Sequence, residues 1–234
     1  MSQILLIIAA LVIAITLHEL AHGIVAYWLG DNTAKQARRL TLNPIRHIDR
    51  TGSIIVPVLL AVGQWLSLGH VAFMYGWAKP VPINPGRLNL GAYRNPRRLM
   101  ALVAIAGPAM NFLLALLGGL AIHATFALSS PLFLSFLAYF IQINLILGLF
   151  NLIPLPPMDG GRIAVGILPL ALALWLAKAE KIGILAVLLL LFILPLALQQ
   201  LGIRFDPFGE ALGIVLPWAE HVIFVLTGNA VGNN

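Results

Sequence analysis

The sequence predicts an all-α polytopic membrane protein, and three observations support this prediction. Of the 234 residues, 60% are hydrophobic and only 9% are charged, whereas soluble domains carry about 25% charged residues. The mean hydropathy is +0.96, and the apolar residues gather in runs close to the ~20 residues that cross a bilayer. This composition excludes soluble, disordered and fibrous proteins, and the length fits a single membrane domain over 1–234.

The first apolar run, 4–30, is long enough to span a bilayer and contains one charged residue, Glu19. A basic loop, 31–50, follows it. The next segment, 53–74, is apolar but is interrupted by proline, glycine, glutamine and histidine, and a second basic loop, 76–98, comes after it. The positive-inside rule places both basic loops on the cytoplasmic side, which favours a re-entrant segment over a single crossing.

The remaining apolar runs complete a prediction of five to six transmembrane helices. The runs 99–127, 132–150 and 182–198 are expected to span the bilayer, and 163–181 is expected to leave it or to lie along its surface. The last run, 208–226, is long enough to cross or to lie in the interface. The stretch WAKPVPIN (77–84) lies within the second basic loop and has an alternating residue pattern. It predicts a short extended loop, or an edge strand that pairs with an extended peptide.

The motif most informative about chemistry lies inside the first apolar run. His18, Glu19 and His22 form H-E-x-x-H within TLHELAHG. Residues four apart share one face of a helix, so the two imidazoles are able to converge on one ion, with the glutamate near a bound water. A carboxylate at membrane depth costs at least ~2.5 kcal/mol, which indicates a functional role for Glu19. The motif predicts a Zn²⁺ site, and a proton or ion pathway is the competing interpretation.

A zinc hydrolase site of this kind needs a third protein ligand. Asp159 is the strongest candidate, because it follows a predicted span within the rigid turn NLIPLPPMDGGR. Helix capping by Asp159 is the simpler alternative. Glu210 and Glu220 are rival ligands, but they stand far from any other motif. Among the other histidines, His47 is expected in solvent or among headgroups.

Three motifs in order resemble the site-2 protease family of intramembrane zinc metalloproteases. They are HELAHG in one predicted span, AGPAMN (106–111) in another, and NLIPLPPMDGGR (151–162) at the end of a third. Together they cover the core region 4–165. The chain is similar to the small prokaryotic branch of the family, which has neither a PDZ insert nor a CBS domain.

This resemblance implies a role for each matching residue. His18, His22 and Asp159 would bind one zinc ion per chain, and Glu19 would be the general base. Asn151 matches a family asparagine thought to hold substrate or the oxyanion, with a turn cap as the alternative.

A second asparagine, Asn111, matches a polar residue of a family element with a substrate-positioning role. A hydrogen bond between helices is the equally plausible alternative.

The implied function is hydrolysis of a peptide bond in or near a transmembrane segment of a membrane protein substrate. The expected location is the cell membrane of a bacterium or archaeon, with the active site nearer the cytoplasmic face. The net charge of +6 suits loops facing lipid headgroups better than a nucleic-acid partner. Two other functions remain open: another H-E-x-x-H membrane protease of the CAAX-processing or HtpX-like kind, and an ion or proton transporter.

Overall fold

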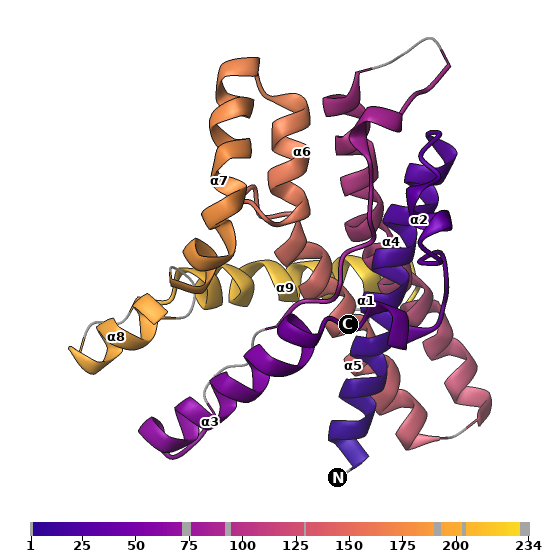
Figure 1. Ribbon diagram of the computed structural model, residues 1–234. Coiled ribbons are helices and arrows are strands. Elements are labelled where there is room, and N and C mark those ends of the chain that lie inside the picture. The colour runs from indigo at the N-terminus through magenta and orange to yellow at the C-terminus, as the bar shows by residue number, and fades with distance from the viewer. Residues whose placement is uncertain are drawn as a thin grey trace.

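The computed structural model describes residues 2–71, 76–91, 95–128, 130–189, 193–202 and 205–229, which form helices and loops without a strand. This confirms the predicted all-α architecture. The helices in chain order are α1 (Ser2–Trp28), α2 (Thr33–Gln36), η1 (Pro44–His47), η2 (Arg50–Ile55), α3 (Val56–Leu68), η3 (Pro85–Arg87), α4 (Pro96–Leu128), α5 (Pro131–Asn151), α6 (Asp159–Ile167), α7 (Leu170–Leu188), α8 (Leu194–Gln200) and α9 (Pro207–Leu226) (Figure 1).

Four helices in the described part of the chain are long and apolar enough to cross a membrane: Gln3–Trp28, Pro96–His123, Pro131–Asn151 and Gly209–Leu226. Two shorter apolar helices, Arg50–Leu66 and Leu170–Ala179, accompany them. Within the predicted span 182–198, α7 ends at Leu188 and α8 begins at Leu194. Residues 190–192 of that span lie outside the described residues.

The core of the molecule is the group of three long helices α1, α4 and α5, which pack against one another. Small residues allow this close approach. Helices in a membrane associate without a hydrophobic driving force, so they depend on the tight backbone packing that small side chains permit. Ala10 of α1 lies in one buried cluster with Leu114 of α4 and Phe140 of α5. A Cβ on Gly118 of α4 would come within 2.9 Å of the side chain of Ile141 on α5.

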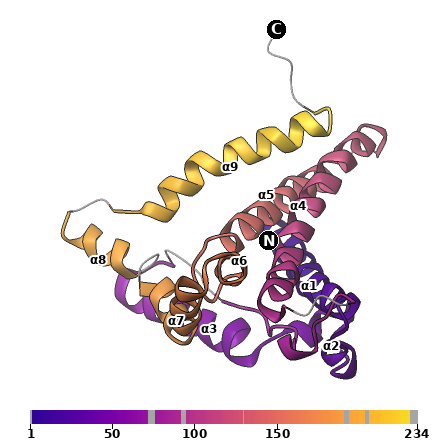
Figure 2. The ribbon, with the colours of Figure 1, turned by 90° about the horizontal axis from the view of Figure 1, so that it is seen from above.

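The other helices surround this core at its sides. Helix α6 packs against α4 and then α7, and α9 packs against α5 and α4. Figure 2 shows α9 running along one side of the core, while α3 and α8 project away from it. The segments that position the chemistry are therefore α1, α4, α5 and the turn that enters α6.

The segment predicted to re-enter the membrane leaves the core and returns to the same place. It begins with the π-helical turn η2 and continues as α3, and residues 72–75 lie outside the described residues. The Trp77 N–H donates to the carbonyl of Gly52 at 3.1 Å, so the two ends of the segment lie side by side. A segment that enters and leaves a membrane at one face needs its two ends to lie side by side in this way. The position of the segment 53–74 in a bilayer stays a prediction.

Candidate metal centre

Two histidines of α1 point at one spot between helices. His18 and His22 are separated by one helical turn, and their Nε2 atoms lie 3.1 Å apart. Both side chains are buried, with 7% of each residue exposed. The four-residue spacing read from the sequence therefore does bring both imidazoles to one face of the helix.

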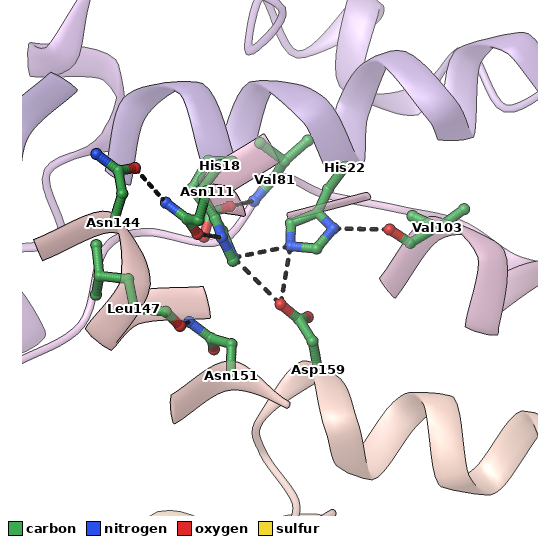
Figure 3. Close-up of polar contacts among 10 residues, drawn as sticks. His18, His22, Val81, Val103, Asn111, Asn144, Leu147, Asn151 and Asp159 are labelled. Carbon is green, nitrogen blue, oxygen red and sulfur yellow. Dashed lines mark hydrogen bonds and ion pairs between the residues drawn. The ribbon is translucent and has the colours of Figure 1, made fainter. Parts of the chain in front are cut away.

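Asp159 reaches the same spot from the first residue of α6. Its Oδ2 atom lies 3.1 Å from the Nε2 of His18 and 3.2 Å from the Nε2 of His22 (Figure 3). The glycine pair after it makes this possible, because the turn folds tightly onto itself. A Cβ on Gly160 would collide with the backbone carbonyl of Leu152, and one on Gly161 would collide with the backbone near Pro156.

These three atoms fit a metal ion. Bonds of about 2.0–2.1 Å in tetrahedral geometry separate ligand atoms by about 3.3–3.4 Å, close to the sides of the observed triangle. The Oδ2 of Asp159 is buried and has no hydrogen-bond donor among the described residues. A buried carboxylate oxygen without a donor is costly, and a cation at the centre of the triangle would satisfy it.

The outer nitrogens of both imidazoles explain why Asp159 has no donor. The Nδ1 of His22 lies 2.8 Å from the carbonyl oxygen of Val103, which only accepts hydrogen bonds. The Nδ1 of His18 lies 2.6 Å from the Oδ1 of Asn111. Each Nδ1 is therefore the hydrogen-bond donor of its ring, which leaves Nε2 as the atom that faces the centre, the arrangement found in metal-binding histidines.

A glycine of α4 makes room for the two imidazoles. A Cβ on Gly107 would overlap the rings of both His18 and His22. Gly107 belongs to the AGPAMN motif and precedes Asn111 by one helical turn, so both residues face α1. The motif thus supplies the space for the rings and a hydrogen bond to one of them.

Glu19 lies beside the centre and is held by an extended segment. Its Oε2 accepts a hydrogen bond from the backbone N–H of Val81 at 2.9 Å. The residues around it line a cavity of about 470 Å³ that also contains the three candidate ligands. Glu19 is therefore near the centre without belonging to it, which is the placement that a general base needs.

The extended segment 76–84 forms one wall of this cavity and is fixed from behind. The N–H of Lys79 donates to the carbonyl of His47 at 2.9 Å, and the carbonyl of Lys79 accepts a hydrogen bond from Arg39 at 2.6 Å. Arg39 is itself buried. Burial lowers the pKa of the Arg39 guanidinium, and the negative charge of Glu19 opposes this shift.

Asn151 lines the cavity from the last residue of α5. Its Nδ2 donates to the carbonyl of Leu147 in its own helix at 3.0 Å. Asn111 is buried between helices instead, where it contacts His18 and donates to Asn144. The structure therefore brings the implied residue Asn151 to the cavity wall and puts Asn111 behind a histidine.

The rival ligands lie elsewhere. His18, His22 and Asp159 are the only group of three or more histidine, aspartate or glutamate side chains in the described residues whose ligand atoms gather within 4.8 Å. Neither Glu210 nor Glu220, both on α9, belongs to this group.

One minor prediction is wrong: His47 is buried, not solvated, and its Nε2 lies 3.0 Å from the carbonyl oxygen of Thr41. The backbone carbonyl of His47 accepts a hydrogen bond from the N–H of Lys79, which joins the extended segment to this loop.

Sequence reasoning missed several residues around the centre. Gly107 could have been recognised from its spacing, one helical turn before Asn111 in a motif already singled out. Asn144 and Arg39 carry no local signal, because a lone asparagine in a span and one arginine of a basic loop have many uses. Val81 acts through its backbone, which no residue type reveals.

Comparisons with known proteins identify relatives of this chain. The model of Peptidase family M50 matches residues 118–194, which contain Asn151 and Asp159. A Bacillus subtilis protein named "Putative zinc metalloprotease YwhC" is 39% identical over 200 residues, which cover 81% of each chain. A Mycolicibacterium smegmatis protein named "Putative zinc metalloprotease Rip2" is 31% identical over 159 residues, or 67% of this chain and 54% of that one.

No solved structure matches the chain significantly. The similarity to the Bacillus protein extends over most of both chains, and together with the family match it shows the family to which this chain belongs. The family and the long apolar helices indicate an integral membrane protein, and the names of the relatives indicate zinc as the metal. The chain belongs to peptidase family M50, the site-2 protease family of zinc metalloproteases.

Proposed function

We propose that this protein is an intramembrane endopeptidase that cleaves a transmembrane protein substrate at one zinc ion per chain. The observation that carries this proposal is the triangle of His18 Nε2, His22 Nε2 and Asp159 Oδ2, in which both histidines belong to a helix long enough to cross a membrane. Three protein ligands leave a fourth tetrahedral position for water or substrate, as in catalytic zinc sites.

The zinc ion, when bound, supplies Lewis acidity that acidifies a water molecule and polarises the scissile carbonyl. Glu19 takes the proton of the attacking water and returns it to the leaving amine. The Val81 N–H bond to Oε2 holds the carboxylate in a fixed orientation while leaving Oε1 for this proton. Each oxygen of Glu19 then has a separate role: Oε2 fixes the orientation of the carboxylate and Oε1 takes the proton.

Asn151 is proposed to help hold the substrate or the developing oxyanion. It lines the same cavity as Glu19 and Asp159. Its Nδ2 donates one hydrogen bond to Leu147, and an amide nitrogen has a second N–H to offer. A donor aimed at developing negative charge stabilises the transition state.

The substrate must lose its helical structure before cleavage, because helical carbonyls are engaged in i to i−4 hydrogen bonds. The extended segment 76–84 is suited to receive an unwound chain. The backbone groups of Trp77, Lys79 and Val81 are tied to the protein. Ala78 and Pro80 also line the cavity. Successive carbonyls of an extended chain point in opposite directions, so those of Ala78 and Pro80 are proposed to accept hydrogen bonds from a substrate strand.

The proposed location is the cell membrane of a bacterium or archaeon, with the site nearer the cytoplasmic face. The basic loop 31–50 precedes η2, and the extended segment that follows α3 lines the cavity. The positive-inside rule puts such loops in the cytoplasm, from which water would reach the site.

The first test measures zinc per chain in purified protein and needs no substrate. We expect about one zinc in the wild type and in Glu19→Gln, and a large loss in Asp159→Ala, because removing one of three ligands opens the site. Glu210→Gln is the matched control and should keep its zinc. Cleavage of a reconstituted transmembrane peptide with an Asn-Gly or Gly-Pro pair should then occur with the wild type and stop in Glu19→Gln.

Other outcomes point elsewhere. Zinc retained in Asp159→Ala but lost in Glu210→Gln or Glu220→Gln would favour the CAAX-processing or HtpX-like kind of protease. No zinc in the wild type, with pH-dependent flux in vesicles, would favour a transporter. Equal cleavage of peptides with and without helix breakers would contradict the unwinding step.

A further inference from the structure

A second buried asparagine, Asn144 of α5, extends the contacts behind the metal centre. Asn111 and Asn144 are both fully buried, with 0% of each residue exposed. The Nδ2 of Asn144 lies 2.8 Å from the carbonyl oxygen of Phe140, and its Oδ1 lies 2.9 Å from the Nδ2 of Asn111. The Oδ1 of Asn111 lies 2.6 Å from the Nδ1 of His18 (Figure 3).

One backbone carbonyl sets the direction of this whole chain of hydrogen bonds. The oxygen of Phe140 only accepts, so Asn144 must turn its NH₂ group to it and its Oδ1 to Asn111. Asn111 must then donate to Asn144 and present its own Oδ1 to His18. His18 Nδ1 is left as the donor, which makes Nε2 the unprotonated nitrogen.

We propose that Asn144 is a positioning residue for zinc binding, which acts through Asn111 on the tautomer of His18. This inference rests on the zinc site of the proposed function. An Asn111 side chain turned by 180° would present NH₂ to Nδ1, and His18 would then carry its proton on Nε2. That tautomer points N–H, and not a lone pair, at the metal position.

The alternative explanation for this pair is packing between α4 and α5. Interhelical hydrogen bonds in membrane proteins contribute little stability on average, and a buried polar pair carries a desolvation cost that apolar residues avoid. Neither fact requires a polar residue at 144. Directional control of a ligand does require one, since outer partners of metal-binding histidines fix ring orientation and tautomer.

Two substitutions separate the two explanations. Asn144→Leu has a similar volume but offers no acceptor, so Asn111 is free to turn. Asn144→Asp keeps an acceptor for the Nδ2 of Asn111 and so keeps its direction. The measurement is the dissociation constant for Zn²⁺ of the full chain in detergent, by competition with a chelator of known affinity.

We expect Asn144→Leu to bind Zn²⁺ about 10- to 100-fold more weakly, as loss of an outer partner typically does, and Asn144→Asp to stay within about threefold of the wild type. Thr227→Val is the matched control, because it removes a buried hydrogen bond to Ile223 at the far end of α9. Its affinity for zinc should not change. The melting temperatures of the metal-free variants show whether each one folds.

Wild-type affinity in a folded Asn144→Leu would overturn the proposal, and so would an equal loss in the Leu and Asp variants. If Asn144→Leu does not fold, Asn144→Ala takes its place with the same expected loss of affinity, and wild-type affinity in that variant or a tenfold loss in Asn144→Asp overturns the proposal. A wild type that binds no Zn²⁺ would overturn the zinc site itself and this inference with it. Normal zinc affinities throughout, without any peptide cleavage, would contradict only the proposed protease function.

Discussion

The two imidazoles of the metal centre are fixed by different kinds of partner. His22 donates from Nδ1 to the backbone carbonyl of Val103, which no substitution removes directly. His18 donates to a side chain, Asn111, and depends on that side chain being oriented correctly. Substitutions around the site should therefore affect the His18 arm more than the His22 arm.

Space at the centre is as important as the ligands themselves. Gly107→Ala would push a methyl group into both rings, and overpacking of this kind costs about 1–3 kcal/mol. We expect zinc affinity to fall by about 10- to 100-fold, measured by chelator competition. Gly213→Ala on α9 is the matched control, because a Cβ there meets nothing within 4 Å. Unchanged zinc affinity in Gly107→Ala would show that the rings lie elsewhere in the functional protein.

Among the secondary-structure elements, the extended segment 76–84 has two faces with separate roles. One face is tied to the loop before α3, and the other lines the cavity, where the Val81 N–H donates to Glu19. Prolines at 80 and 82 remove two backbone donors, so Val81 supplies the N–H that reaches Glu19. The segment therefore connects substrate binding to the orientation of the proposed base.

This connection predicts different results for two substitutions at one position. Val81→Pro removes the N–H that holds Glu19, whereas Val81→Ala removes more side chain and keeps the N–H. We expect Val81→Pro to lower kcat by at least about tenfold, a part of the 10²- to 10⁴-fold that a positioned base contributes, with zinc content unchanged. Cleavage of the reconstituted peptide measures this. Similar kcat values for the two variants would contradict a role for the Val81 N–H.

In the whole molecule, the metal centre joins segments that are distant in the chain. Its ligands come from α1 and α6, and their outer partners come from α4 and α5. Helix α6 is short and continues into α7, which lies at the side of the core (Figure 1). A bound ion would therefore attach the α6–α7 pair to the three central helices.

Metal removal should accordingly lower the stability of the whole protein. A ligand present at 1,000 times its dissociation constant stabilises the folded state by about 4 kcal/mol, and each kcal/mol corresponds to about 2–4 °C for a chain of this length. We expect a chelator to lower the melting temperature of the wild type and to leave that of Asp159→Ala nearly unchanged. A wild type that melts at the same temperature with and without chelator would contradict the structural role of the metal.

The sequence was most informative where local geometry decides the outcome. Helical periodicity alone puts His18 and His22 on one face, and a hydrophobic run of sufficient length makes α1 a spanning helix. The rigid turn around Asp159 was visible from its prolines and glycines. A single crossing over 182–198 stays a prediction, because residues 190–192 lie outside the described part of the chain.

By itself, the sequence determined the all-helical membrane class and the face of α1 that carries His18 and His22. Both follow from periodicity, length and residue chemistry, which act over a few turns of helix. Asp159 was one candidate ligand, favoured by the family resemblance, and only the tertiary structure brings it to the two histidines. Only the tertiary structure decided the orientation of His18 through Asn111 and Asn144, the space at Gly107 and the bond from Val81 to Glu19. Each of these contacts joins residues more than 30 positions apart, and such contacts depend on how helices pack, which no local pattern encodes.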